Sequence, residues 1–282
     1  MLLNAAGLEA PTSDAWTDYM QSAIARVEAR VAPGRTFLWM DEAPDRLAKV
    51  RSGQIVVSGV GEQNPKRVPD GLIHDWIGAV FIPNAKLTDV LGVTRDYPKY
   101  KELFRPAVVD SKALDSSINA AGETKDRYSM RLINKSIFLK TAFDIDFESR
   151  IVQMDASRGY ALSWSTRIQQ IEEYGESGQH MLPEGQGDGI IWHLFSTTRF
   201  AERDGGVYLE IEVIGLSRDI PASIRWLAEP IARRVSRSTL TTSLRQTESA
   251  VHQRIQVAAL QAKGHALVAS ARDLPASASK IP

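Results

Sequence analysis

The sequence predicts an α+β fold in which a curved antiparallel sheet of about seven strands packs around a long C-terminal helix, behind an N-terminal α/β extension. Three observations predict it. Six strand-like segments follow one another between residues 107 and 216, two short helical segments precede them, and one long helical segment follows them. Runs of strands followed by a helix are typical of a sheet that carries its helices on one face.

Composition argues against several classes of function. The 282 residues carry 34 Lys and Arg against 34 Asp and Glu, so no net charge attracts nucleic acid. The chain has no cysteine and none of its five histidines lies four positions from another, so we expect no metal site and no cofactor. No segment approaches the roughly 20 apolar residues of a membrane-spanning helix.

The start of the chain, residues 1–16, lacks the basic and apolar regions of a signal peptide. We therefore expect a cytoplasmic protein with no nucleic-acid partner and no integral membrane segment. A secretion leader trimmed from upstream is the alternative, and the oligomeric state stays open.

Residues 1–12 are expected to be disordered, and residues 13–70 to form the N-terminal extension. Apolar residues between Trp16 and Val31 recur at helical spacing, so this stretch predicts an amphipathic helix. Further elements are expected as a strand at 36–40, a helix at 43–51, a strand at 54–58 and a loop at 59–71.

Residues 71–251 are expected to form the main domain, and residues 252–282 the helix end and a flexible tail. The loop 174–189 is long for a strand connection, so it is either a lid or a passive insertion. The elements expected in the main domain are a strand at 72–83, a helix at 87–95, a helical turn at 99–104, and strands at 107–114, 127–134, 141–154, 160–173, 190–203 and 207–216.

The last hairpin predicts which side chains face the helix. A two-residue Asp204-Gly205 turn of type I′ sets the register. The numbers of two residues that lie opposite each other then sum to 409. The face with Arg199 opposite Glu210 is typical of a solvated sheet surface. The opposite face, expected to meet the helix, pairs Phe200 with Leu209, Thr198 with Ile211 and Ser196 with Val213. On the strand 160–173, alternation turns Tyr160, Leu162, Trp164, Thr166 and Ile168 inward.

The long helix, expected over residues 221–251, has small residues at the centre of its inner arc. A core-facing helix normally places its largest apolar side chains there. Either space is left for a molecule that is not protein, or the helix is closely packed with its hydroxyls bonded to their own turn. The small residues are Ala232, Ser236, Thr239, Ser243, Thr247 and Ala250, with Leu240 and Leu244 along one border.

Two segments carry a family resemblance. VFIPNAKLTDVLGVTRDYPKYKELF at 80–104 resembles the passage from first strand to paired helices in the START-like (SRPBCC) superfamily, and GLSRDIPASIRWLAEP with its following helix, at 215–250, is similar to the closing segment. The resemblance covers residues 72–251. It implies the helix-grip fold of polyketide cyclases, START lipid-transfer domains and Bet v 1-like proteins, with a cavity between sheet and C-terminal helix for apolar molecules. It carries no catalytic signature.

Three functions stay open. The leading hypothesis is binding of a lipid, sterol or polyketide-like molecule in that cavity, as a carrier or sensor. The second is a cyclase or aromatase-type enzyme with His74 as acid or base, although a loop-bonded histidine is the simpler interpretation. The third is a protein-interaction module whose N-terminal helix fills the groove. The predicted ligand-binding residues are Trp76, Trp164, Thr166, Trp192, Ser196, Thr198, Ile211, Val213, Ser236, Thr239, Leu240, Ser243 and Thr247.

Overall fold

The computed structural model describes residues 8–135, 140–188 and 190–272. The strands are β1 (Val56–Gly59), β2 (Lys66–Val68), β3 (Gly71–Pro83), β4 (Val108–Ile118), β5 (Thr124–Lys135), β6 (Lys140–Gln153), β7 (Arg158–Glu172), β8 (His180–Met181), β9 (His193–Arg203) and β10 (Gly206–Arg218). The helices are α1 (Ala10–Val31), η1 (Trp39–Glu42), α2 (Pro44–Arg51), α3 (Leu87–Thr94), η2 (Tyr97–Lys99), α4 (Tyr100–Leu103) and α5 (Arg225–Arg272). The predicted α+β class is confirmed.

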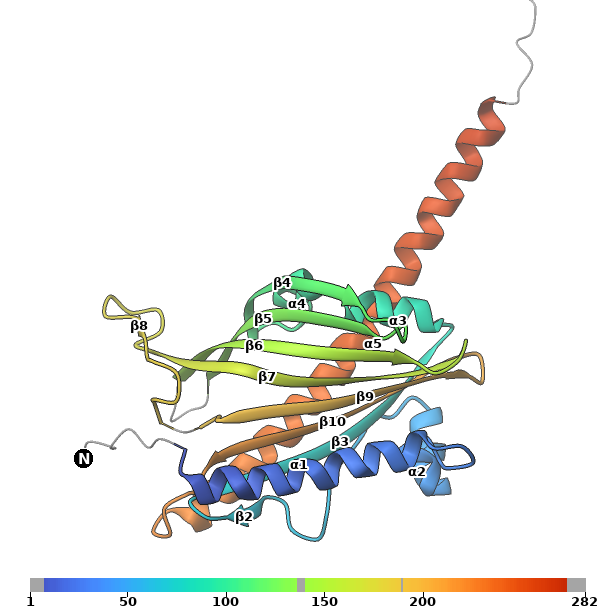
Figure 1. Cartoon of the computed structure of the whole chain (residues 1–282). Helices are drawn as coiled ribbons and strands as arrows, with labels where there is room; N and C mark the ends of the chain where they lie inside the picture. Colours follow the sequence, from blue (N-terminus) through green and yellow to red (C-terminus); the bar gives the residue numbers. More distant parts are fainter. Residues whose placement is uncertain (1–7, 136–139, 189, 273–282) are drawn as a thin grey trace, which may run out of the picture.

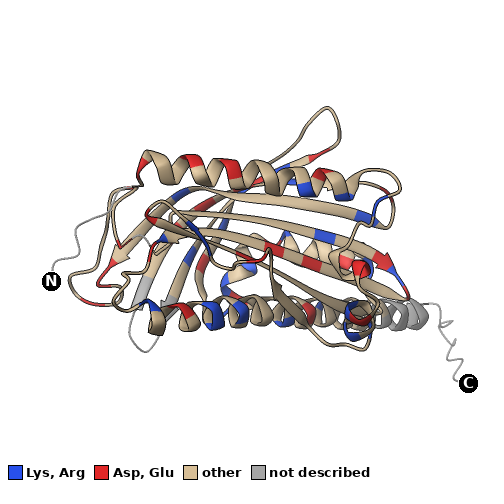
Figure 2. Cartoon of the chain, turned by 90° about the horizontal axis from the view of Figure 1, so that it is seen from below, with Lys and Arg blue, Asp and Glu red and all other residues tan. Residues whose placement is uncertain are grey.

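In the described residues the strands form one antiparallel sheet in the order β1-β3-β10-β9-β7-β6-β5-β4, with β2 beside β3 and β8 beside β7. Figure 1 shows the curved sheet with α1 in front of it and α5 behind it. We call the face toward α5 the inner face and the face toward α1 the outer face. Figure 2 shows the same three layers from below, with acidic and basic residues scattered along both helices.

The N-terminal extension is part of this sheet, because β1 and β2 both pair with β3. Its helix α1 begins at Ala10, within the stretch expected to be disordered. Thr12 is fully buried, and its hydroxyl donates to the Pro69 carbonyl at 2.8 Å. The predicted strand at 36–40 is wrong. These apolar residues bury their side chains against α2 and the outer face from an irregular segment that ends in η1.

The register predicted for the last hairpin is confirmed. Asp204 and Gly205 have positive φ values of 56° and 78°, as a type I′ turn requires. Leu209 lies opposite Phe200, and Val213 lies opposite Ser196. The sequence therefore predicted correctly which side chains share a face.

The long helix α5 is anchored to the edge of the inner face. Leu240, Leu244 and Val251 are buried in a cluster with Val57 of β1 and Val80 of β3. The helix spans 48 residues and passes through Pro230 without ending, so it continues where a tail was expected. Figure 1 shows its C-terminal part projecting beyond α3. Among the described residues, no helix is both long and apolar enough to cross a membrane.

Candidate functional site

The two faces of the central strands differ in burial. Along β9, Ser196 and Thr198 point to the inner face and are half-buried, whereas Thr197 and Arg199 point to the outer face and are 1% and 0% exposed. The outer face was expected to be solvated, and this expectation is wrong, because α1 and residues 37–40 cover it. The accessible side is the inner one.

Part of the inner face is only half-buried, and we call this strip of the sheet the groove. Helix α5 packs mainly on β1, β3 and α3, and it leaves Ser196, Thr198 and Ser163 of β9 and β7 half-buried. On the far side Tyr97 stacks on Tyr128, with 4.1 Å between ring centroids, and Tyr128 stacks on Phe147. At one end Gln246 of α5 donates to the Arg105 carbonyl at 2.6 Å. The groove therefore lies between α5 and this aromatic stack.

The groove floor has a polar row beside a more apolar row. The polar row runs across six strands, and within it the Ser163 hydroxyl donates to the Ser149 hydroxyl at 2.8 Å. Neighbouring residues of one row are register partners on adjacent strands and share a face. The polar row is Trp76, Val213, Ser196, Ser163, Ser149 and Asp126, and the apolar row is Gly78, Ile211, Thr198, Ala161 and Ile151.

The small residues of α5 form the groove wall in part. Helical geometry places Ser236, Thr239 and Ser243 on the side of α5 that also carries Gln246, which bonds the α4–β4 loop. Ser236 and Ser243 are half-buried, and Thr239 is exposed.

Two other predicted wall residues pack closely instead. Thr247 is buried and its hydroxyl donates to the Ser243 carbonyl at 2.9 Å, which is the bonding expected of a close-packed helix. Leu240 is buried against the sheet.

Three predicted binding residues lie elsewhere. Trp164 and Trp192 pack in the cluster beneath α1, on the outer face. Trp192 also lines a surface cavity of about 470 Å³ at the start of α1. Thr166 is exposed and donates to the Asp146 carbonyl at 3.3 Å. Trp76, Ser196, Thr198, Ile211 and Val213 lie on the inner face as predicted.

The error on β7 comes from a bulge. Ala161 and Ser163 pair with inner-face residues of β9, so Tyr160, Leu162 and Trp164 point outward, opposite to the prediction. The register then shifts opposite Asp146 and Phe147. Beyond the shift Ile168 faces inward as expected, because one extra residue changes the phase of the alternation.

The inner face carries titratable groups at both ends of the sheet. His74 begins the groove floor on β3, and burial lowers its pKa to about 4, so its imidazole is neutral at neutral pH. Asp126 lies on β5. Its burial favours a higher pKa, but hydrogen bonds from Arg95, Ser116 and Tyr97 outweigh this and hold the pKa below its usual range.

Sequence reasoning missed the part of the polar row formed by Ser149, Ser163 and Asp126. The alternation predicted for the strand 160–173 turned Ser163 outward, and the alignment of the three residues depends on pairing across β5, β6 and β7. No signal within one strand could predict that alignment.

The N-terminal helix does not fill the groove. It packs on the opposite face, where Arg26 donates to Asp75 and Glu212 at 3.0 Å each. Ala23 and Val27 of α1 are buried against Ile214 and Leu216 of the outer face. The hypothesis of a groove occupied by its own N-terminal helix is therefore wrong.

No family model matches the chain, and no curated protein matches it. Similar solved structures include the STAR-related lipid transfer protein from Xanthomonas axonopodis, with 14% identity over 70% of this chain and 98% of that one (TM-score 0.44). Human STARD10 shares 8% identity over 88% and 82% (TM-score 0.43). The Zhui aromatase/cyclase from a Streptomyces species shares 13% over 65% and 96% (TM-score 0.39). These similar structures come from the groups named by the sequence resemblance.

Proposed function

We propose that the chain binds an apolar small molecule in the groove between α5 and the inner face, as a carrier or sensor. One observation carries the proposal. In the middle of β9 and β10 the inner-face side chains are half-buried, while their outer-face neighbours are buried; the inner-face residues are Ser196, Thr198, Ile211 and Val213, and the outer-face residues are Thr197, Arg199, Glu210 and Glu212. A sheet that leaves one face accessible beside a long helix offers a concave site that a ligand can cover.

The lining suits an apolar molecule with a polar group. Ile211, Val213 and Ala161 supply apolar floor, and burial of ligand carbon against them contributes about 25 cal/mol per Å². Ser196 and Thr198 supply hydroxyls that can orient one polar group of the ligand. In most ligand sites a small number of polar groups fix the orientation in this way. Residues 71–251 would form the binding domain, with α1 sealing its outer face.

Catalysis by a cyclase-type mechanism remains a prediction. His74 lies on the inner face as that mechanism requires, but Asp126 lies on β5, five strands away in the sheet order. The two groups therefore do not converge on one reacting atom. Binding is the function that the geometry supports best.

Titration with N-phenyl-1-naphthylamine, a neutral dye that fluoresces in apolar sites, tests the proposal. We expect saturable binding of one dye per chain, and displacement of the dye by 1-dodecanol. Mass spectrometry of the extracted native protein would then identify the bound molecule. A dye signal that does not saturate, or that dodecanol leaves unchanged, would contradict the proposal.

A further inference from the structure

Two ring nitrogens on the inner face of β3, at the α5 edge of the groove, have no hydrogen-bond partner among the described residues. His74 Nδ1 and Trp76 Nε1 are both buried, and neither is bonded to any of the described residues. The two residues lie two positions apart on β3, so their side chains share the inner face. Buried polar atoms in proteins are nearly always hydrogen-bonded, so such a pair calls for a partner.

Other atoms of the described residues without a hydrogen bond belong to charged groups that form ion pairs. These groups are Arg30 with Glu42, Asp75 with Arg26, Arg199 with Glu210, and Arg225 with Asp219. His74 and Trp76 differ, because both are neutral and neither belongs to an ion pair.

The hydrogen bonds around His74 favour one tautomer. The Ser217 hydroxyl donates to the Arg218 carbonyl at 3.3 Å, so it accepts from His74 Nε2–H at 3.1 Å. Nδ1 then carries a lone pair and is an acceptor. Because burial lowers the pKa of His74 to about 4, this holds at neutral pH. Trp76 Nε1–H is a donor.

We propose that His74 and Trp76 bind the hydroxyl group of an apolar alcohol, which donates to His74 Nδ1 and accepts from Trp76 Nε1–H. The inference rests on the proposed function and names its ligand class. Residues two apart on a strand are separated by about 6.6 Å, so two large rings can reach one oxygen between them. A carboxylate could not donate to Nδ1, and an ammonium could not accept from Nε1.

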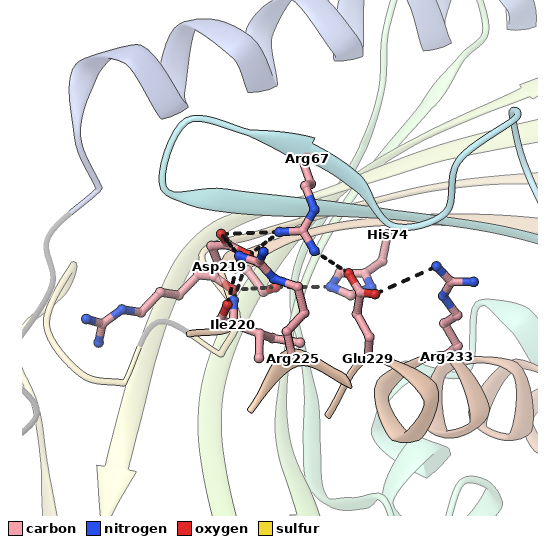
Figure 3. A network of polar contacts seen from close by, with 9 residues as sticks. Arg67, His74, Asp219, Ile220, Arg225, Glu229 and Arg233 are labelled. Atoms are coloured by element: carbon pink, nitrogen blue, oxygen red, sulfur yellow. Dashed lines mark hydrogen bonds and ion pairs between the residues drawn. The ribbon is translucent and has the colours of Figure 1, made fainter. Parts of the chain in front are cut away.

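The first turns of α5 lie beside His74. Figure 3 shows His74 beside Glu229, which bonds Arg67 at 2.5 Å, while Arg225 bonds Asp219 at 3.1 Å. Both rings are half-buried although their nitrogens are buried. In this proposal the ligand reaches the nitrogens when these turns of α5 move outward. The turns are held mainly by exposed polar contacts, which are weak.

The test compares two competitors that differ in one donor. 1-Dodecanol and dodecyl methyl ether both have an oxygen that accepts a hydrogen bond, but only the alcohol donates one. In displacement of N-phenyl-1-naphthylamine, we expect the alcohol to bind about tenfold more tightly, because the ether leaves His74 Nδ1 unpaired. Dodecanoate should bind more weakly than the alcohol.

Two variants separate the two nitrogens. His74→Phe should abolish the preference for alcohol over ether. Trp76→Phe should lower the affinity for both competitors by a similar factor, since the oxygen of each accepts from Nε1–H. The preference for the alcohol over the ether should remain. His180 is exposed on β8, so His180→Phe is the matched control. It should change neither the two affinities nor the preference for the alcohol.

Equal binding of alcohol and ether by the unmodified protein would overturn the inference and leave the proposed function intact. Absence of saturable dye binding would overturn the proposed function itself. The comparison in the unmodified protein decides the matter even where circular dichroism shows that His74→Phe does not fold.

Discussion

Arg199 Nη1 lies 2.9 Å from Glu210 Oε1 across β9 and β10, and neither side chain is exposed. The Glu210 carboxylate also accepts from the Met40 backbone N–H at 3.2 Å. Burial raises the pKa of Glu210, although the Arg199 charge opposes the shift. This ion pair therefore sits where the N-terminal extension covers the outer face.

Removal of one partner of this pair should destabilise the fold strongly. Arg199→Met leaves a buried carboxylate, so we expect a loss of about 3–5 kcal/mol in the free energy of unfolding, measured in urea. The double variant Arg199→Met, Glu210→Met should recover most of that loss, because it removes both charges. A double variant less stable than Arg199→Met alone would contradict this account.

The raised pKa of Asp75 should make the free energy of unfolding depend on pH. Burial, together with the Glu212 charge, raises the pKa of Asp75 from 3.8 to about 7, although Tyr19 and Arg26 bind its carboxylate. The folded protein then holds a proton that the unfolded chain releases. The contribution of Asp75 to stability is therefore complete below about pH 4 and is lost as the pH rises through about 7.

The variant Asp75→Asn cannot ionise, so it should gain stability relative to the unmodified protein between pH 4.5 and 8, measured as urea midpoints across that range. Asp126→Asn is the control of opposite sign. Since the pKa of Asp126 is lowered, its contribution is present at neutral pH and is lost in acid. Parallel pH profiles for Asp75→Asn and the unmodified protein would refute the assignment.

Local signals in the sequence predicted most of the fold. The Asp204-Gly205 turn fixed the pairing of Phe200 with Leu209, because turn geometry and strand alternation act over a few residues. Local signals did not predict which face of the sheet would be covered. That outcome depends on α1, whose Arg26 meets Glu212 across 186 positions of sequence. For the same reason the polar row, and the bulge that shifts the register of β7, could be recognised only in the assembled sheet.

Gly78 should be sensitive to any side chain, because α5 lies directly above it. A Cβ at this position would lie 2.7 Å from Leu244 Cδ1 and 3.0 Å from Val57 Cγ2. Gly78→Ala should cost about 1–3 kcal/mol through overpacking, measured by urea unfolding. The second substitution Leu244→Ala makes room, so the cost of Gly78→Ala should shrink in that background. An unchanged cost would show that α5 is not the obstacle.

A large side chain at Ser243 should block the groove. Ser243 is half-buried on the groove side of α5, so the indole of Ser243→Trp would occupy the space above the floor. We expect the Kd for N-phenyl-1-naphthylamine to rise at least tenfold. Thr239→Trp should have a smaller effect, because Thr239 is exposed at the rim. Fluorescence titration measures both.

Ser249 provides the matched control on the same helix. It is exposed, and at 100° per residue it lies opposite Leu240, which faces the sheet. Ser249→Trp therefore adds the same indole outside the groove and should leave the Kd unchanged. Urea midpoints that agree among the three variants would exclude unfolding as the cause. Equal dye affinity in Ser243→Trp and Ser249→Trp would place the ligand elsewhere and remove the basis for the proposed function.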